Sequence, residues 1–272
     1  MLDGKDESCE LNGAGLGSCG SKSTVSGSAV GTSTVPRKPV LVVVHQVHSN
    51  PGHVGQWFVR NGHPLDIRRH YAGDPLPETL VDHCGAVIFG GPQSANDNLG
   101  FIRREIDWIG VPLKEQKPFL GICLGGQMLA HHLGARVDHC CNGTVEIGYH
   151  PVRPTQAGAS ALGGLPSKVF QWHREGFELP RDGTLLATSD GAYPNQVFCY
   201  GPLGAAVGVQ FHPEITFAQV NRWSGGNPMR LLMRGARPRQ EQMETHLMQG
   251  PRVQDWLDHF LRRWVAVGQK SG

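Results

Sequence analysis

Cys123 lies in a stretch whose residue types and spacing suit nucleophilic catalysis. Residues 118–122 form a short apolar run typical of a buried strand, and residues 124–133 have the spacing of a helix. The pattern predicts a cysteine at a strand-to-helix corner, where a nucleophile is both exposed and held. The free N–H groups and dipole of the helix N-terminus favour the thiolate form there. Space for a tight turn and a close-fitting substrate comes from Gly121, Gly125 and Gly126.

Three short segments follow one another along the chain with recognisable patterns. Residues 89–97 read FGGPQSAND, residues 121–127 read GICLGGQ, and residues 208–216 read GVQFHPEIT. The second segment resembles the Cys-x-Gly-x-Gln nucleophile elbow of class I (triad) glutamine amidotransferases, and the third resembles the His-Pro-Glu segment of that family. The first resembles the Gly-Gly-Pro oxyanion strand of the branch typified by the glutaminase domain of GMP synthetase. The resemblance extends over roughly residues 40–223.

This resemblance implies an amidohydrolase with a thiolate nucleophile. Cys123 is expected to attack the amide carbon, and His212 to take the thiol proton and later protonate the leaving ammonia. Glu214 is expected to orient the imidazole of His212. The backbone N–H groups of Leu124 and Gly91 are expected to stabilise the oxyanion.

The resemblance also implies residues that bind the substrate. Gly90 is expected to leave room for the substrate carbonyl; the alternative is an ordinary turn at the end of a strand. Gln127 lies about one helical turn after the cysteine and is expected to hold the α-amino acid end of the substrate, the alternative being a solvent-facing glutamine. Trp172 and His173 look like family residues that line the glutamine site. Their alternative is a core Trp172 beside a partly exposed His173.

Three functions fit these residues. The first is hydrolysis of L-glutamine to glutamate and ammonia through a γ-glutamyl thioester on Cys123. The ammonia would pass to a separate synthetase or acceptor subunit, because no Ser-Gly-Gly-x-Asp-Ser stretch follows in the sequence. The second is a stand-alone peptidase that uses the same triad on a γ-glutamyl peptide or another γ-glutamyl compound. The third is a non-catalytic binding or regulatory module, which has no physical need for the complete set of motif residues.

Composition argues against several other classes. The chain has 25 basic and 23 acidic residues, so its net charge of +2 gives no strong field to attract nucleic acid or an anionic membrane. Seven irregularly spaced cysteines, with no apolar run of membrane-span length and no signal peptide, predict a reduced, cytoplasmic setting. Cys140 and Cys141 lack a second ligand pair at zinc spacing, so we expect no metal and no other cofactor.

The apolar pattern predicts the elements that position these residues. Strands expected at residues 40–44, 65–71, 86–89 and 118–122 alternate with helical stretches, one of them marked by apolar residues between 102 and 113. This alternation predicts an α/β fold with a doubly wound, mostly parallel central sheet and helices on both faces, and the resemblance implies a flavodoxin-like sheet. Gly90 and Cys123 then lie at the carboxyl ends of strands, where such sheets bind ligands.

The rest of the chain is expected to complete one domain over residues 37–272. Mixed or antiparallel strands that extend the sheet and flank the active site are expected at 135–137, 146–152, 169–172, 184–188, 196–200 and 205–210. A helix is expected to begin at residue 217, and residues 253–261 predict an amphipathic C-terminal helix packed on the core. Residues 1–36 are rich in Gly and Ser and lack aromatic residues, which predicts a disordered tail.

Overall fold

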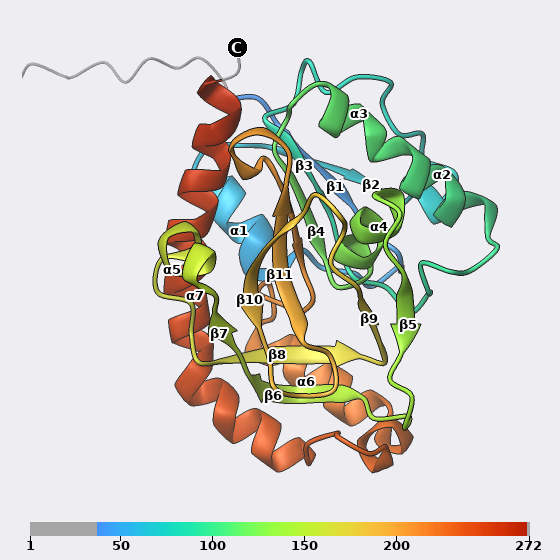
Figure 1. Cartoon of the computed structure of the whole chain (residues 1–272), viewed down its shortest axis with the longest axis vertical. Helices are drawn as coiled ribbons and strands as arrows, with labels where there is room; N and C mark the ends of the chain where they lie inside the picture. Colours follow the sequence, from blue (N-terminus) through green and yellow to red (C-terminus); the bar gives the residue numbers. More distant parts are fainter. Residues whose placement is uncertain (1–36, 271–272) are drawn as a thin grey trace, which may run out of the picture. The chain divides into compact units, whose positions relative to one another are not determined.

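An eight-stranded sheet lies at the centre of the described part of the chain (Figure 1), and short apolar runs form its buried strands β1, β3, β4 and β12. The computed structural model describes residues 37–270, and the predicted tail of residues 1–36 lies outside this part of the chain. The strand order is β2-β1-β3-β4-β12-β11-β10-β7. The first five strands are parallel and follow the 2-1-3-4-5 order of flavodoxin-like folds, and from β12 onward neighbouring strands pair antiparallel. The strands are β1 (Val40–Val43), β2 (Leu65–Arg68), β3 (Gly85–Ile88), β4 (Phe119–Ile122), β7 (Arg153–Pro154), β10 (Thr184–Thr188), β11 (Asn195–Tyr200) and β12 (Ala206–Val209).

Alternate side chains of the buried strands build an apolar layer on each face of this sheet. In β1, Val40 and Val42 belong to one layer and Leu41 and Val43 to the other, and all four side chains are fully buried. Helices α1 and α7 cover the first layer, and α2 and α4 cover the second (Figure 1). Their bounds are α1 (Gly52–Arg60), α2 (Gly100–Trp108), α4 (Leu124–His132) and α7 (Arg239–Lys270). The predicted fold class is therefore confirmed.

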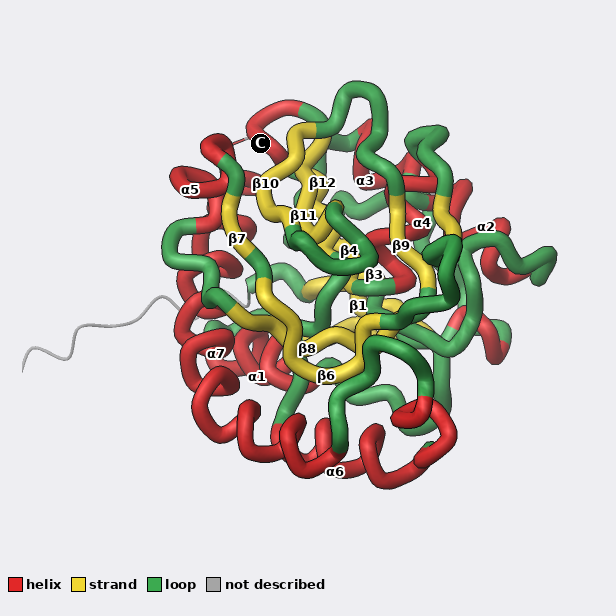
Figure 2. The backbone as a smooth tube through the Cα atoms, turned by 60° about the horizontal axis from the view of Figure 1, so that its bottom comes forward, coloured by secondary structure: helices red, strands yellow, loops and turns green. Residues whose placement is uncertain are grey.

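The segment from 135 to 211 differs in part from the prediction. Only β7, β10, β11 and β12 join the central sheet, whereas β5 pairs with β9 and β6 pairs with β8 in two separate sheets. The β6–β8 sheet packs against α6 (Phe217–Gly226) through Tyr149, Phe170 and Val220, so its apolar face is covered by a helix (Figure 2). These strands are β5 (Val137–His139), β6 (Glu146–Pro151), β8 (Lys168–His173) and β9 (Glu175–Phe177). The sequence pattern did not predict β9.

The helices also show where local chemistry changed the expected pattern. The single helix expected across residues 102–113 is divided into α2 and α3 (Gly110–Lys114), because Pro112 cannot continue the hydrogen bonding of α2. Helix α5 (Gln156–Leu162) was not predicted, although Thr155 caps it by accepting a hydrogen bond from Gly158 N. Helix α6 begins at the predicted residue. Among the described residues, no helix is both long and apolar enough to cross a membrane.

Candidate active site

Cys123 occupies the predicted corner between β4 and α4. Its φ of 52° and ψ of −107° are unusual for a residue with a side chain and cost about 1–3 kcal/mol. The surrounding glycines make this geometry possible: a Cβ at Gly121 would lie 2.3 Å from Gly125 O, and one at Gly125 would lie 2.1 Å from Ile88 O. The side chain is 5% exposed and faces a pocket. Backbone strain at a residue that reaches a pocket is typical of a nucleophile elbow.

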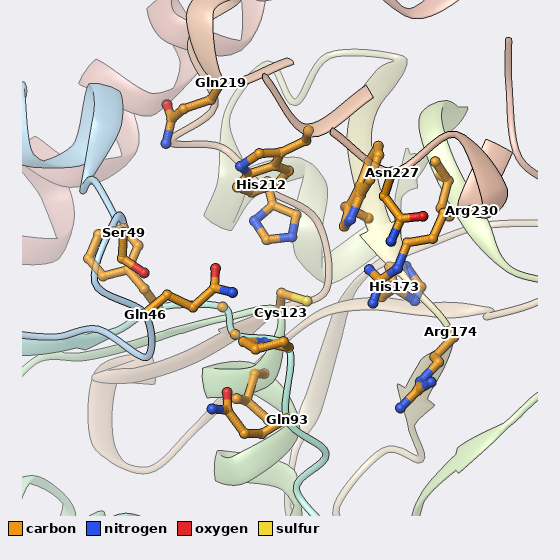
Figure 3. Close-up of a pocket in the computed structure, with 18 of the residues that line it drawn as sticks. Gln46, Ser49, Gln93, Cys123, His173, Arg174, His212, Gln219, Asn227 and Arg230 are labelled. Carbon is orange, nitrogen blue, oxygen red and sulfur yellow. The ribbon is translucent and has the colours of Figure 1, made fainter. Parts of the chain in front are cut away.

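His212 and Glu214 lie beside the cysteine, on the segment that follows β12. His212 Nδ1 is 2.8 Å from Glu214 Oε1, and each side chain is 4% exposed. Among the described residues the other ring nitrogen, Nε2, has no hydrogen-bond partner, and the ring stands over Cys123 (Figure 3). A Cβ at Gly90 would lie 2.8 Å from His212 Cε1 and 3.4 Å from Cys123 Cβ, so Gly90 fits against both side chains. This geometry suits a cysteine nucleophile with a histidine base and an orienting carboxylate.

The charges around His212 favour its protonated form. Burial on its own would lower the pKa of the imidazole, but the negative charges of Glu214 and Cys123 outweigh burial and raise the pKa to about 10. Trp223 packs edge-on against the ring at 5.0 Å between centroids, and His212 N donates a 2.9 Å hydrogen bond to Phe170 O. The ring is therefore fixed in position and suited to an ion pair with a thiolate.

Two backbone N–H groups are available for an oxyanion. Gly91 N has no hydrogen-bond acceptor in residues 37–270, and Gly91 lines the pocket next to Cys123. Leu124 also lines the pocket and is the first residue of α4, so its N–H has no acceptor within the helix. The predicted pair of donors therefore borders the same pocket as the cysteine.

The pocket has a volume of about 460 Å³ and carries unpaired positive charge. Arg174, Arg222 and Arg230 line it, and within the described part of the chain none of their side chains forms an ion pair or hydrogen bond. Figure 3 shows Arg174 and Arg230 on the same side of Cys123 as His173. The two acidic residues in the lining are already engaged, since Glu214 contacts His212 and Glu175 accepts a hydrogen bond from Ser94 Oγ. The pocket therefore suits a ligand with a carboxylate.

Gln127, Trp172 and His173 all line this pocket. Gln127 is 3% exposed and its Nε2 donates a 2.7 Å hydrogen bond to Glu175 O, so it is not a solvent-facing glutamine. His173 is buried between Glu175 O and Gln171 Oε1, at 2.9 and 3.0 Å, while Trp172 is only half-buried and stacks on Phe170. The alternative of a core Trp172 and a partly exposed His173 is therefore wrong.

Several residues around the site were not singled out by the sequence analysis. Arg222, Trp223 and Arg230 come from α6 and from the turn that follows it, where no pattern marks them. His45 and Glu105 form a buried pair behind Gly90. His45 follows β1 and so lies at the ligand-binding edge of the sheet, which is the one feature that could have marked it. Among the described residues, no group of three or more His, Cys, Asp or Glu side chains could hold a metal.

Comparison with known proteins gives the same family. Residues 53–221 match the glutamine amidotransferase class-I family. The glutamine amidotransferase-like protein YfeJ of Salmonella typhimurium is 33% identical over 190 residues, which cover 66% of this chain and 77% of YfeJ. The glutamine-hydrolyzing GMP synthase of Porphyromonas gingivalis is 33% identical over 148 residues, but these are 53% of this chain and only 28% of that protein.

Solved structures extend the likeness to three dimensions. A glutamine amidotransferase from Thermotoga maritima superimposes with a TM-score of 0.75 at 31% identity, covering 84% of this chain and 98% of that one. A glutamine amidotransferase from Methylobacillus flagellatus gives a TM-score of 0.78 at 26% identity, covering 85% of this chain and 95% of that one. Together with the strand-to-helix corner at Cys123 and its pocket, these matches show that the chain belongs to the class I glutamine amidotransferase family.

Proposed function

We propose that the protein hydrolyses the side-chain amide of L-glutamine to glutamate and ammonia. The observation that carries this proposal is the convergence of Cys123, His212 and Glu214 on a pocket bordered by Gly91, whose N–H has no acceptor in the described part of the chain. A strained nucleophile, a histidine with a raised pKa and a vacant backbone donor serve acyl transfer and have no evident purpose in a purely structural core.

The reaction divides into acylation and deacylation. The Cys123 thiolate attacks the amide carbon, and the N–H groups of Gly91 and Leu124 stabilise the oxyanion that forms. When this intermediate collapses, the C–N bond breaks and the His212 imidazolium gives its proton to the leaving nitrogen, which releases ammonia. Neutral His212 then takes a proton from water, the water attacks the γ-glutamyl thioester, and glutamate leaves as the Cys123 thiolate is restored.

The pocket offers separate groups for the two ends of the α-amino acid. Arg174 and Arg230 have no ion-pair partner within residues 37–270, and these cations suit the α-carboxylate. Gln127 holds Glu175 O through its Nε2 and accepts no hydrogen bond at its Oε1 from the residues described, so that oxygen is free to accept from the α-ammonium group. Half-buried Trp172 and buried His173 would complete the wall on that side.

The lengths of two matched relatives support a proposal for the fate of the ammonia. The stretch that matches the GMP synthase of Porphyromonas gingivalis is 28% of that protein. In Thermoplasma acidophilum, by contrast, a single subunit of the glutamine-hydrolyzing GMP synthase matches over 66% of its own length at 33% identity. We infer that the acceptor active site for the ammonia lies on a separate polypeptide.

A second candidate is hydrolysis of γ-glutamyl peptides or related γ-glutamyl compounds. Figure 3 shows Gln46 and Ser49 on the other side of Cys123 from Arg174 and Arg230, and this part of the same pocket leaves space for a leaving group larger than ammonia. The acyl half of the reaction would be the same in both cases, so only the leaving group distinguishes them.

The two candidates separate when the protein is incubated with L-glutamine and, in parallel, with a γ-glutamyl dipeptide. We expect glutamate release from glutamine, lost by at least about a thousandfold in Cys123→Ala. The matched control is Cys84→Ala, because Cys84 is a free cysteine that does not line the pocket. Preferred turnover of the dipeptide would favour the second candidate. Absence of turnover on both substrates, with no labelling of Cys123 by iodoacetamide, would exclude both.

A further inference from the structure

A buried histidine–glutamate pair lies directly behind the Gly90–Gly91 turn. His45 Nε2 is 2.7 Å from Glu105 Oε2, and both side chains are 0% exposed. The other ring nitrogen, His45 Nδ1, is 3.3 Å from Gly90 O. The pair joins the carboxyl end of β1 to the inner face of α2, and the mechanism above does not use it.

The pair and the catalytic residues hold the turn from opposite sides. A Cβ at Gly91 would lie 2.7 Å from His45 Cβ, so His45 packs against this residue. A Cβ at Gly90 would instead meet the ring of His212 at 2.8 Å. Consecutive residues of an extended chain point their Cβ positions to opposite sides. Here the Cβ position of Gly91 points to His45, and that of Gly90 points to His212 and Cys123.

Peptide geometry connects His45 to the oxyanion donor. Gly90 C=O and Gly91 N–H belong to one peptide unit, and in a trans peptide these two groups point in opposite directions. A hydrogen bond that holds Gly90 O towards His45 therefore aims the Gly91 N–H away from His45, towards the pocket. Without it, a peptide between two glycines is free to rotate and present its carbonyl to the oxyanion instead.

The hydrogen-bond partners define which ring nitrogen acts as the donor. A carbonyl oxygen only accepts, so His45 Nδ1 donates to Gly90 O, and Nε2 is left for the Glu105 carboxyl group. Burying two ionisable side chains costs free energy that an apolar pair of similar size would not cost, so stability alone gives little reason for this pair.

We propose that His45 and Glu105 are positioning residues that lock the Gly90–Gly91 peptide in the orientation that stabilises the oxyanion. This inference rests on the proposed amide hydrolysis. It predicts that loss of the donor to Gly90 O slows acylation while the nucleophile keeps its reactivity, because Cys123 and His212 do not contact the pair. Removing an oxyanion donor typically costs about 10²–10³ in kcat, and misaiming one is expected to cost about ten- to hundredfold.

Two double variants isolate the hydrogen bond. His45→Asn with Glu105→Leu keeps an N–H near the position of Nδ1, and His45→Leu with Glu105→Leu removes it; neither contains the histidine–glutamate pair. We expect the asparagine variant to hydrolyse amide within about fivefold of the parent, and the leucine variant to lose about ten- to hundredfold in kcat with little change in KM. Alkylation of Cys123 by iodoacetamide needs no oxyanion donor and should proceed at the parent rate in both. Equal kcat in the two variants, or a parallel fall in alkylation, would overturn the proposal.

Single variants and a spectroscopic signature cover the remaining outcomes. If a double variant does not fold, His45→Asn and His45→Leu make the same comparison with Glu105 retained, and equal kcat in these two variants would overturn the lock. The ¹⁵N resonances of the His45 ring report the lock without turnover, since Nδ1, the donor to Gly90 O, should carry a proton. A ring protonated at Nδ1 in a protein that hydrolyses neither substrate would mean that the proposed function has failed and the lock has not. A ring without a proton at Nδ1 in an active protein would mean the reverse.

Discussion

At the scale of single residues, the charges around His212 predict how the proposed reaction depends on pH. Glu214 and Cys123 raise the pKa of His212 from 6.5 to about 10 against the effect of burial, so the ring stays protonated through neutral pH. A raised pKa means that the ion pair stabilises the folded protein fully below about pH 6.5 and that this contribution is lost as the pH rises through about 10. The proposed amide hydrolysis needs that proton for the leaving nitrogen, so its rate should fall over the same alkaline range.

Glu214→Gln tests this dependence. It removes the largest favourable charge on His212, so we expect the alkaline limb of the kcat profile to move to lower pH and kcat to fall at least about tenfold. Glu178→Gln is the control, because Glu178 is exposed, pairs with Arg136 and does not line the pocket. An alkaline limb at the same pH in Glu214→Gln would contradict the assigned role of the carboxylate.

Arg230 tests the proposed carboxylate contact. Arg230→Gln removes a half-buried pocket cation that is unpaired in the described residues, and we expect KM for glutamine to rise about tenfold with kcat nearly unchanged. Arg234→Gln makes the same chemical change at an exposed arginine four residues along the chain that does not line the pocket, and it should leave KM unaltered. Equal KM values in the two variants would show that Arg230 does not contact the substrate.

The sequence singled out some residues of the candidate site and not others, and the difference has a physical reason. Cys123, Gly91 and His212 lie in short segments whose local pattern has a chemical meaning. The contact of His45 with Glu105, in contrast, joins residues 60 positions apart, and no local pattern encodes it. Contacts of this kind appear only when adjacent strands and the helix after them are in place.

At the scale of elements, helix α4 can follow directly after Cys123 only because Gly125 lets the helix pack close to strand β3. A Cβ at Gly125 would lie 2.1 Å from Ile88 O, which is backbone and cannot move aside. Gly125→Ala should therefore destabilise the protein by about 3 kcal/mol or more in urea unfolding. Gly225→Ala is the matched change in helix α6, where the nearest atom beyond its own helix is 3.7 Å away, and it should be neutral or stabilising by up to about 1 kcal/mol. Equal stability of the two variants would mean that α4 can shift away from β3.

The strands differ in how well the sequence predicted them. The buried strands β1, β3 and β4 were predicted to within one or two residues because continuous apolar runs have few other interpretations. The β6–β8 pair was predicted as strands but placed in the wrong sheet, because its apolar side chains pack on α6 and the sequence does not specify that partner. Composition suggests strand or helix, but tertiary packing decides which elements meet.

At the scale of the whole molecule, α7 ties the end of the chain to the central sheet. This 32-residue helix continues through Pro251 and is much longer than predicted, and its buried side chains belong to the same core cluster as those of β1 and α1. We therefore expect α7 and the sheet to unfold together.

Leu261→Ala, at a fully buried position, should lower the free energy of unfolding by about 2–5 kcal/mol. Leu247→Ala, on the same helix but 66% exposed, should stay within about 0.5 kcal/mol of the parent. Urea unfolding followed by far-UV circular dichroism and by tryptophan fluorescence should give coincident transitions in both variants, with Leu261→Ala shifted to lower urea. A helical transition that precedes the fluorescence change would instead show that α7 is a separate unit attached to a self-sufficient sheet.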